Sequence, residues 1–244
     1  ANFVVTTDVA AQATLEVTGV TSLVFTDGDD TVDLNNVVAA DADDGNVSNA
    51  GDGRDIVTLA DNATEAAEAG FVVGETFFGG AGEDNITGGG LDDVIDGGDD
   101  NDLILSGAGN DTIFSGGGNN FVRGEVGDDS IVGGSNRDSF FGDEGNDTIS
   151  GGGGRDTLRG GDDNDSLSGD TSDDDLFGGN GNDTLFGGDG FDELFGEAGN
   201  DLIEGGIGND SMDGGAGVDD VYGWNGNDFV NFAVGIFIEH VVGF

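Results

Sequence analysis

A nine-residue repeat is the feature that most constrains the fold of this chain. From Gly79 to Asn231 the sequence divides into 17 consecutive nonapeptides without an insertion or deletion, such as GGNGNDTLF at 178–186 and GGDGFDELF at 187–195. The sixth position is Asp in 16 of the 17 units, the eighth is apolar in all 17, and glycine holds the first position in 15. Self-similarity at a fixed short period is typical of solenoids, in which each unit buries its apolar side against its neighbours.

The composition excludes several classes of partner. The chain carries 52 acidic and 5 basic residues, a formal net charge of −47, so nucleic acid and anionic membrane surfaces would repel it. No apolar run approaches the length of a membrane span. Cysteine is absent and His240 is the single histidine, which excludes disulfides, thiolate metal sites and histidine clusters. We therefore expect no nucleic-acid partner and no membrane insertion.

The repeat resembles that of a known family. GGxGxDxUx, with U a large apolar residue, is similar to the calcium-binding repeat of the RTX (repeats-in-toxin) family of secreted bacterial proteins. The resemblance covers 153 of the 244 residues. It implies an all-β fold, a right-handed parallel β-roll or β-solenoid, in which six residues form a turn, three form a short strand and two nonapeptides complete one coil. It also implies type I-like secretion and an extracellular or cell-surface location.

The residue types agree with this geometry. Glycines at the first, second and fourth positions permit positive φ and close approach of neighbouring backbones. In a three-residue strand, alternation sends the eighth residue inward and the seventh and ninth outward. One inward apolar residue per nonapeptide makes a thin core, which we do not expect to overcome the charge repulsion by itself.

The sixth-position aspartates require a cation. With two units per coil, they stack in two columns with partners two units apart along the chain, where like charges about 5 Å apart repel by ~0.8 kcal/mol per pair even in water. Ca²⁺ takes six to eight oxygens from carboxylates and backbone carbonyls in a tolerant geometry, whereas Mg²⁺ is stricter. We predict about 15 or more Ca²⁺ ions. The predicted ligands are Asp30, Asp55, Asp84, Asp93, Asp102, Asp111, Asn120, Asp129, Asp138, Asp147, Asp156, Asp165, Asp174, Asp183, Asp192, Asp201, Asp210, Asp219 and Asp228.

Some turns depart from the motif, and we expect weaker or empty sites there. Asn120 lacks a carboxylate. The fourth-position glycine is replaced in five turns, by Leu91, Asp100, Asn136, Asp163 and Ser172.

The regular block, 79–231, lies between two other segments of what we interpret as one continuous domain. In 1–78 the units TDGDDTVDL (26–34) and GDGRDIVTL (51–59) repeat the motif at longer intervals, from Asp30 to Asp55 and from Asp55 to Asp84, which predicts wider coils and a cap. The segment 232–244 is an apolar strand-like stretch. It is short for the C-terminal export signal that the resemblance implies, so we expect a fragment or another role for this end.

The sequence favours a non-enzymatic protein, because the HExxH and GxSxG motifs are absent. Self-association is predicted by two features. The apolar segments 2–6 and 232–240 predict end-to-end contacts, unless each segment folds over its own end of the roll and covers it. Two rows of outward aromatic side chains predict lateral contacts, unless the rings of each row cover one another. The rows are Phe141, Phe177 and Phe195 on one face, and Phe114, Phe186 and Tyr222 on the other. Carbohydrate is a further candidate partner.

Two functions follow from these observations. The first is a calcium-binding extracellular structural protein that folds on calcium and assembles into a filament, surface layer or matrix. The alternative is a calcium-responsive module of a larger type I-secreted enzyme, toxin or adhesin, where it aids export, folding or carbohydrate attachment.

Overall fold

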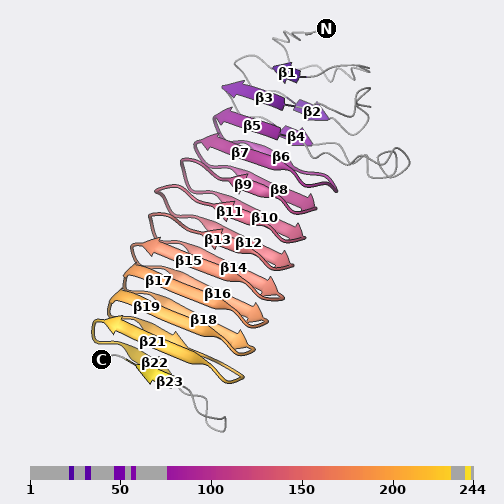
Figure 1. Ribbon diagram of the computed structural model, residues 1–244. Helices are drawn as coiled ribbons and strands as arrows, with labels where there is room; N and C mark the ends of the chain where they lie inside the picture. Colours follow the sequence, from indigo (N-terminus) through magenta and orange to yellow (C-terminus); the bar gives the residue numbers. More distant parts are fainter. Residues whose placement is uncertain are drawn as a thin grey trace.

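The computed structural model describes residues 22–24, 31–33, 47–52, 56–58, 76–231 and 240–242. These residues form two parallel sheets, one of twelve strands and one of eleven, and successive strands of the chain alternate between the sheets. Figure 1 shows the resulting stack of coils, with the N-terminal strands at one end and β23 at the other. The predicted all-β parallel roll is thus confirmed, and no helix occurs among the residues described.

The odd-numbered strands form the larger sheet: β1 (Ser22–Val24), β3 (Val47–Asp52), β5 (Thr76–Ala81), β7 (Val94–Asp99), β9 (Thr112–Phe114), β11 (Ser130–Val132), β13 (Thr148–Ser150), β15 (Ser166–Thr171), β17 (Thr184–Gly190), β19 (Leu202–Gly208), β21 (Asp220–Asn225) and β23 (His240–Val242). The even-numbered strands form the other: β2 (Thr31–Asp33), β4 (Ile56–Thr58), β6 (Asn85–Thr87), β8 (Leu103–Ala108), β10 (Phe121–Val126), β12 (Ser139–Glu144), β14 (Thr157–Asp162), β16 (Asp175–Asn180), β18 (Glu193–Ala198), β20 (Ser211–Asp213) and β22 (Phe229–Asn231).

Strand register fixes the size of each coil. Within the regular block, partners are two nonapeptides apart along the chain, as in the pairing of Phe77 with Ile95 and of Phe177 with Phe195. Wider N-terminal coils appear in the pairing of Thr31 with Ile56 and of Ile56 with Asn85, which reproduces the intervals predicted from the motif. The cap predicted within 1–78 lies outside the described residues, apart from the short strands of this segment.

Many strands are six residues long, so the expected three-residue strand was too short. Pairing at the seventh to ninth positions of one unit resumes at the second and third positions of the next, for example where Gly161 of β14 faces Gly179 of β16. Backbones carrying glycine approach closely enough to extend the ladder into the turn. The turns then bend at positive φ, as at Gly98 (φ 106°) and Gly109 (φ 129°).

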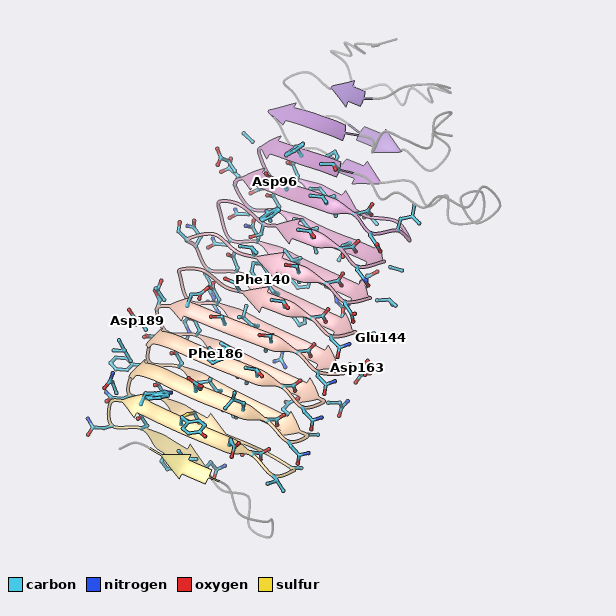
Figure 2. All side chains as sticks on the ribbon, in the orientation of Figure 1. Asp96, Phe140, Glu144, Asp163, Phe186 and Asp189 are labelled. Carbon is cyan, nitrogen blue, oxygen red and sulfur yellow. The ribbon has the colours of Figure 1, made fainter. Side chains whose placement is uncertain are left out.

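The core is a column of single side chains inside the coils. Every eighth-position residue from Ile86 to Val221 is buried, and Val230 is partly buried, which confirms the predicted inward face. Phe77 extends the column by one position toward the N-terminus. Phe140, labelled in Figure 2, belongs to this column. The fully buried members are Phe77, Ile86, Ile95, Ile104, Ile113, Val122, Ile131, Phe140, Ile149, Leu158, Leu167, Leu176, Leu185, Leu194, Ile203, Met212 and Val221.

Candidate metal centre

The sixth-position aspartates form two continuous columns, one along each edge of the roll. From Asp84 to Asp210, the backbone N–H of each sixth-position residue donates to the Oδ1 atom of the sixth-position residue one coil later, as Asp93 does to Asp111 at 2.7 Å and Asp192 to Asp210 at 3.1 Å. From Asp84 to Asp219 these side chains are 3% exposed or less, far below what is usual for aspartate. The turns therefore hold a row of carboxylates in fixed orientation inside the protein.

The second carboxylate oxygen, Oδ2, lacks a donor in most of these turns. It is buried and accepts no hydrogen bond in Asp102, Asp111, Asp129, Asp147, Asp156, Asp165, Asp174, Asp183, Asp192, Asp201, Asp210, Asp219 and Asp228. A buried acceptor without a partner costs about 1–3 kcal/mol, and more when it is charged. A row of such atoms at equivalent positions fits a series of cation-binding sites better than a series of separate defects.

A backbone carbonyl oxygen converges on the same place. A Cβ atom built on Gly187 would lie 2.5 Å from Asp192 Oδ2 and 2.5 Å from the carbonyl oxygen of Gly205 in the next coil. Gly169 has the same surroundings, with Asp174 Oδ2 at 2.6 Å and the next coil's first-position carbonyl at 2.7 Å. A Cβ at Gly187 or Gly169 would crowd these two oxygens, whereas Ser106 and Ser115 hold the first position in two other turns. The oxygens that meet there are the hard ligands that Ca²⁺ prefers.

Carboxylates alone do not complete such a site. No group of three or more Asp, Glu, His or Cys side chains suited to a metal occurs in the described part of the chain. A bound ion would therefore draw most of its ligands from backbone carbonyls, as the glycine-rich turns allow. The residues present fit calcium on this donor set, because magnesium keeps its waters and demands a stricter octahedron.

The protonation behaviour of the columns points to the same need for positive charge. Burial, opposed by a backbone hydrogen bond and assisted by the charges of neighbouring aspartates, raises the pKa of Asp129, Asp165 and Asp174 to about 8. Burial likewise raises the pKa of Asp102 and Asp156 to about 7. Negative charge in these turns is unfavourable near neutral pH unless a cation accompanies it.

Fourth-position substitutions divide into two groups. Asp100, Asp163 and Ser172 adopt the positive φ of the glycine that they replace, and Oδ2 of the aspartate two residues later stays unpaired. Leu91 and Asn136 do not have positive φ.

In the turns that contain Leu91 and Asn136, the second-position N–H donates to the sixth-position carboxylate. Gly89 donates to Asp93 Oδ2 at 3.3 Å, and Gly134 donates to Asp138 Oδ2 at 3.4 Å. These two turns thus supply a donor of their own. Loss of the fourth-position glycine marks these two turns in the sequence, but the same loss occurs in three turns that do not form this hydrogen bond.

Asn120 belongs to the column but carries an amide in place of the carboxylate. Its Oδ1 accepts from the N–H of Asp102 at 2.9 Å, and its Nδ2 donates to the carbonyl oxygens of Ser115 and Gly117 at 3.1 and 3.2 Å. Asp30 and Asp55 lie outside the described residues; the strands that follow them, β2 and β4, are aligned with β6, which follows Asp84. Their role as ligands stays a prediction.

The predicted aromatic rows lie in register on the outer faces. On the β10–β18 face the Arg159 guanidinium lies 3.9 Å from the Phe177 ring centroid, and Phe177 stacks on Phe195 at 5.0 Å, so these rings are half-buried by their neighbours. On the opposite face Phe114 is 44% and Phe186 36% exposed. Figure 2 shows Phe186 on that outer face.

Comparison with known families agrees with this geometry. The family model of the RTX calcium-binding nonapeptide repeat, which spans four copies, matches overlapping windows that together cover residues 78–230: 78–113, 87–122, 114–149, 123–158, 150–185, 159–194, 177–212 and 195–230. No curated protein matches the chain. None of the described residues forms a helix long and apolar enough to cross a membrane.

Proposed function

Because the chain belongs to the RTX calcium-binding nonapeptide-repeat family, we propose that it is a non-enzymatic extracellular structural protein that folds on calcium and assembles with further copies of itself. RTX repeats bind calcium, their roll is a structural rather than a catalytic domain, and the family is typical of secreted proteins. The proposal adds the role of calcium in folding, the ligand residues, and assembly into a filament, surface layer or matrix.

The observation that carries the proposal is the convergence of unpaired Asp Oδ2 atoms and carbonyl oxygens. Calcium would be held by the sixth-position carboxylates and by carbonyls of the stacked turns, and it would supply the positive charge that the chain itself lacks. Two ion pairs involve the described arginines, Arg123 with Asp143 and Arg155 with Asp175, and both lie on the surface rather than in the columns. Surface pairs of this kind contribute about 0–1 kcal/mol.

The energetics favour folding that depends on the ion. Extracellular modules bind calcium with dissociation constants of about 10⁻⁴–10⁻³ M. Tenfold saturation of one such site stabilises the folded state by about 1.4 kcal/mol. A dozen or more sites would then contribute on the order of 20 kcal/mol, comparable with the stability of a whole domain.

Exposed apolar side chains support assembly. Phe114 and Val132 are neighbours across β9 and β11, and they are 44% and 38% exposed. In the last regular coil Trp224 and Phe229 are 56% and 64% exposed. Apolar surface of this kind on a strongly anionic rod favours contact with another surface once calcium has reduced the charge.

Light scattering and electron microscopy test the proposal together. The solution mass is measured in chelator, in several millimolar Mg²⁺ and in several millimolar Ca²⁺, and the calcium sample is imaged. We expect an expanded monomer in chelator and in Mg²⁺, and regular filaments or sheets in Ca²⁺. A compact monomer that stays monomeric in Ca²⁺ would contradict the assembly and favour the module of a larger secreted protein. An unchanged expanded monomer would contradict calcium-driven folding.

A matched pair of variants separates assembly from folding. Phe114→Ser removes an exposed ring from β9, whereas Thr112→Ser changes a half-buried outward residue of the same strand by one methyl group. We expect both to fold at the calcium concentration of the unmodified chain and only Phe114→Ser to assemble less. Equal assembly of the two variants would exclude this row as a contact surface.

A further inference from the structure

In the turn 115–120 the Asn120 side chain makes hydrogen bonds with backbone atoms where the other turns have an unpaired carboxylate oxygen, while the buried Ser115 Oγ has no hydrogen-bond partner. Asn120 is 3% exposed, and its Oδ1 accepts the N–H of Asp102 as an aspartate Oδ1 does elsewhere in the column. This bond fixes the orientation of the amide, because only the oxygen can accept. The Nδ2 atom therefore takes the place that Oδ2 has in the other turns.

The amide nitrogen has two N–H groups, and both are used. They point at the carbonyl oxygens of Ser115 and Gly117, at 3.1 and 3.2 Å. In an aspartate turn the same place holds one more acceptor and no donor. An amide thus provides by hydrogen bonding what the other turns leave to a cation, and a neutral amide nitrogen with its hydrogens directed inward repels a metal ion.

In the next turn on the same edge, both carboxylate oxygens also accept hydrogen bonds from backbone N–H groups. Asp138 follows Asn120 by one coil, its Oδ1 accepts the N–H of Asn120 at 2.7 Å, and its Oδ2 accepts the N–H of Gly134 at 3.4 Å. Two consecutive turns of one column therefore contain their own donors. Unpaired Oδ2 atoms lie on both sides of this pair, at Asp102 and at Asp156.

We propose that Asn120 closes its turn to calcium and that, together with the Asp138 turn, it interrupts the ion column of that edge, which divides it into two separate calcium arrays. The proposal rests on the calcium function proposed above, and it replaces the sequence-based expectation that Asn120 is a ligand. Asn120 is then a specificity-determining residue that makes its turn independent of calcium.

The test is a count of bound ions in Asn120→Asp. The aspartate removes both donors and restores a carboxylate facing the Ser115 and Gly117 carbonyls. The control is Asn119→Asp, which adds the same charge at the adjacent, exposed position, where Oδ1 accepts the N–H of Arg137 at 3.1 Å and a carboxylate can do the same. Native mass spectrometry at saturating calcium gives the number of ions for each chain.

We expect Asn120→Asp to bind at least one ion more than the unmodified chain, and Asn119→Asp to bind the same number. Equal counts for the two variants, or a failure of Asn120→Asp to fold in saturating calcium, would overturn the proposal. Absence of calcium from the unmodified chain would refute the proposed function itself, and this outcome is recognised without either variant.

A second variant tests the role of the donors. Asn120→Ala leaves the two carbonyls without an N–H and offers no new ligand. We expect an unchanged number of ions and a several-fold higher calcium concentration at the folding midpoint, measured by circular dichroism. An extra ion in Asn120→Ala, or an unchanged midpoint, would show that the amide does not close the turn.

Discussion

Protons should partly replace calcium, and this prediction follows from the buried carboxyls. Burial raises the pKa of nine sixth-position aspartates to between about 6 and about 8: Asp102, Asp129, Asp138, Asp147, Asp156, Asp165, Asp174, Asp192 and Asp201. In the unfolded chain the pKa of an aspartate is about 3.9. At pH 5 the folded, calcium-free chain therefore holds about nine protons that the unfolded chain has released.

The sign and size of the effect follow from this difference. Because the folded state binds more protons, its stability is greatest at low pH and is lost as the pH rises through about 6 to 8. Each extra proton is worth about 1.4 kcal/mol per pH unit at full strength. Even discounted several-fold for the water that reaches the turns, nine protons stabilise the fold by on the order of 5 kcal/mol over two pH units.

The assay is far-ultraviolet circular dichroism in calcium-free buffer between pH 8 and pH 5. We expect β-structure to increase as the pH falls, and the calcium concentration at the folding midpoint to fall over the same range, because protons and calcium both stabilise the folded state relative to the unfolded one. Asp165→Asn is the matched variant: its amide donates at every pH, so it should gain calcium-free structure at pH 8 and respond less to acid. A signal that does not change between pH 8 and pH 5 would refute the reasoning.

Three further predictions concern packing, the turns and the ion. Leu194→Ala opens a cavity in the core column and should destabilise the calcium-bound form by about 2–5 kcal/mol. Val132→Ala, at an exposed position, should change the stability by about 0.5 kcal/mol or less. Thermal unfolding in calcium measures both variants, and equal losses of stability would contradict the core assignment. Gly187→Ala would place a Cβ 2.5 Å from Asp192 Oδ2 and from the Gly205 carbonyl oxygen, and it should lower the number of bound ions. Gly117→Ala, whose new Cβ would lie 3.5 Å from its nearest neighbour, should leave that number unchanged. Equal ion counts for the two variants would exclude the space beside Gly187 as a calcium site. Magnesium at the same concentration should not restore the fold after calcium is removed, as circular dichroism would show, and full recovery in magnesium would contradict the preference for a tolerant oxygen geometry.

Much of the fold could be predicted because one period determines it. Two nonapeptides per coil bring every sixth-position and every eighth-position residue into line, so the core from Ile86 to Val221 and the aspartate columns were readable from the sequence. The length of the strands was not, since pairing between second-position and third-position residues depends on how closely glycine backbones approach. The short C-terminal strand β23 pairs with β21 through His240 and Asp220, an interval that does not fit the period of the repeat.

The differences among the turns were the part that the sequence could not resolve. Loss of the fourth-position glycine leads to two outcomes, a strained positive φ at Asp163 and a different turn at Leu91. The left-handed conformation costs a non-glycine residue roughly 1–2 kcal/mol, which the surrounding coils offset in one turn and not in another. For Asn120 the sequence predicted a ligand at a weaker or empty site; the two hydrogen bonds of its amide became visible only in the folded turn.

The central claim is that calcium orders this chain, and small-angle X-ray scattering across a calcium titration tests it most directly. An unfolded chain of 244 residues has a radius of gyration of about 54 Å, whereas a compact fold of that length has one of about 18 Å and a short rod somewhat more. We predict a radius near the unfolded value in chelator at pH 7.5, a cooperative fall toward that of a short rod in millimolar Ca²⁺, and full reversal when chelator is added. A compact chain in chelator, or an expanded chain in calcium, would contradict the account.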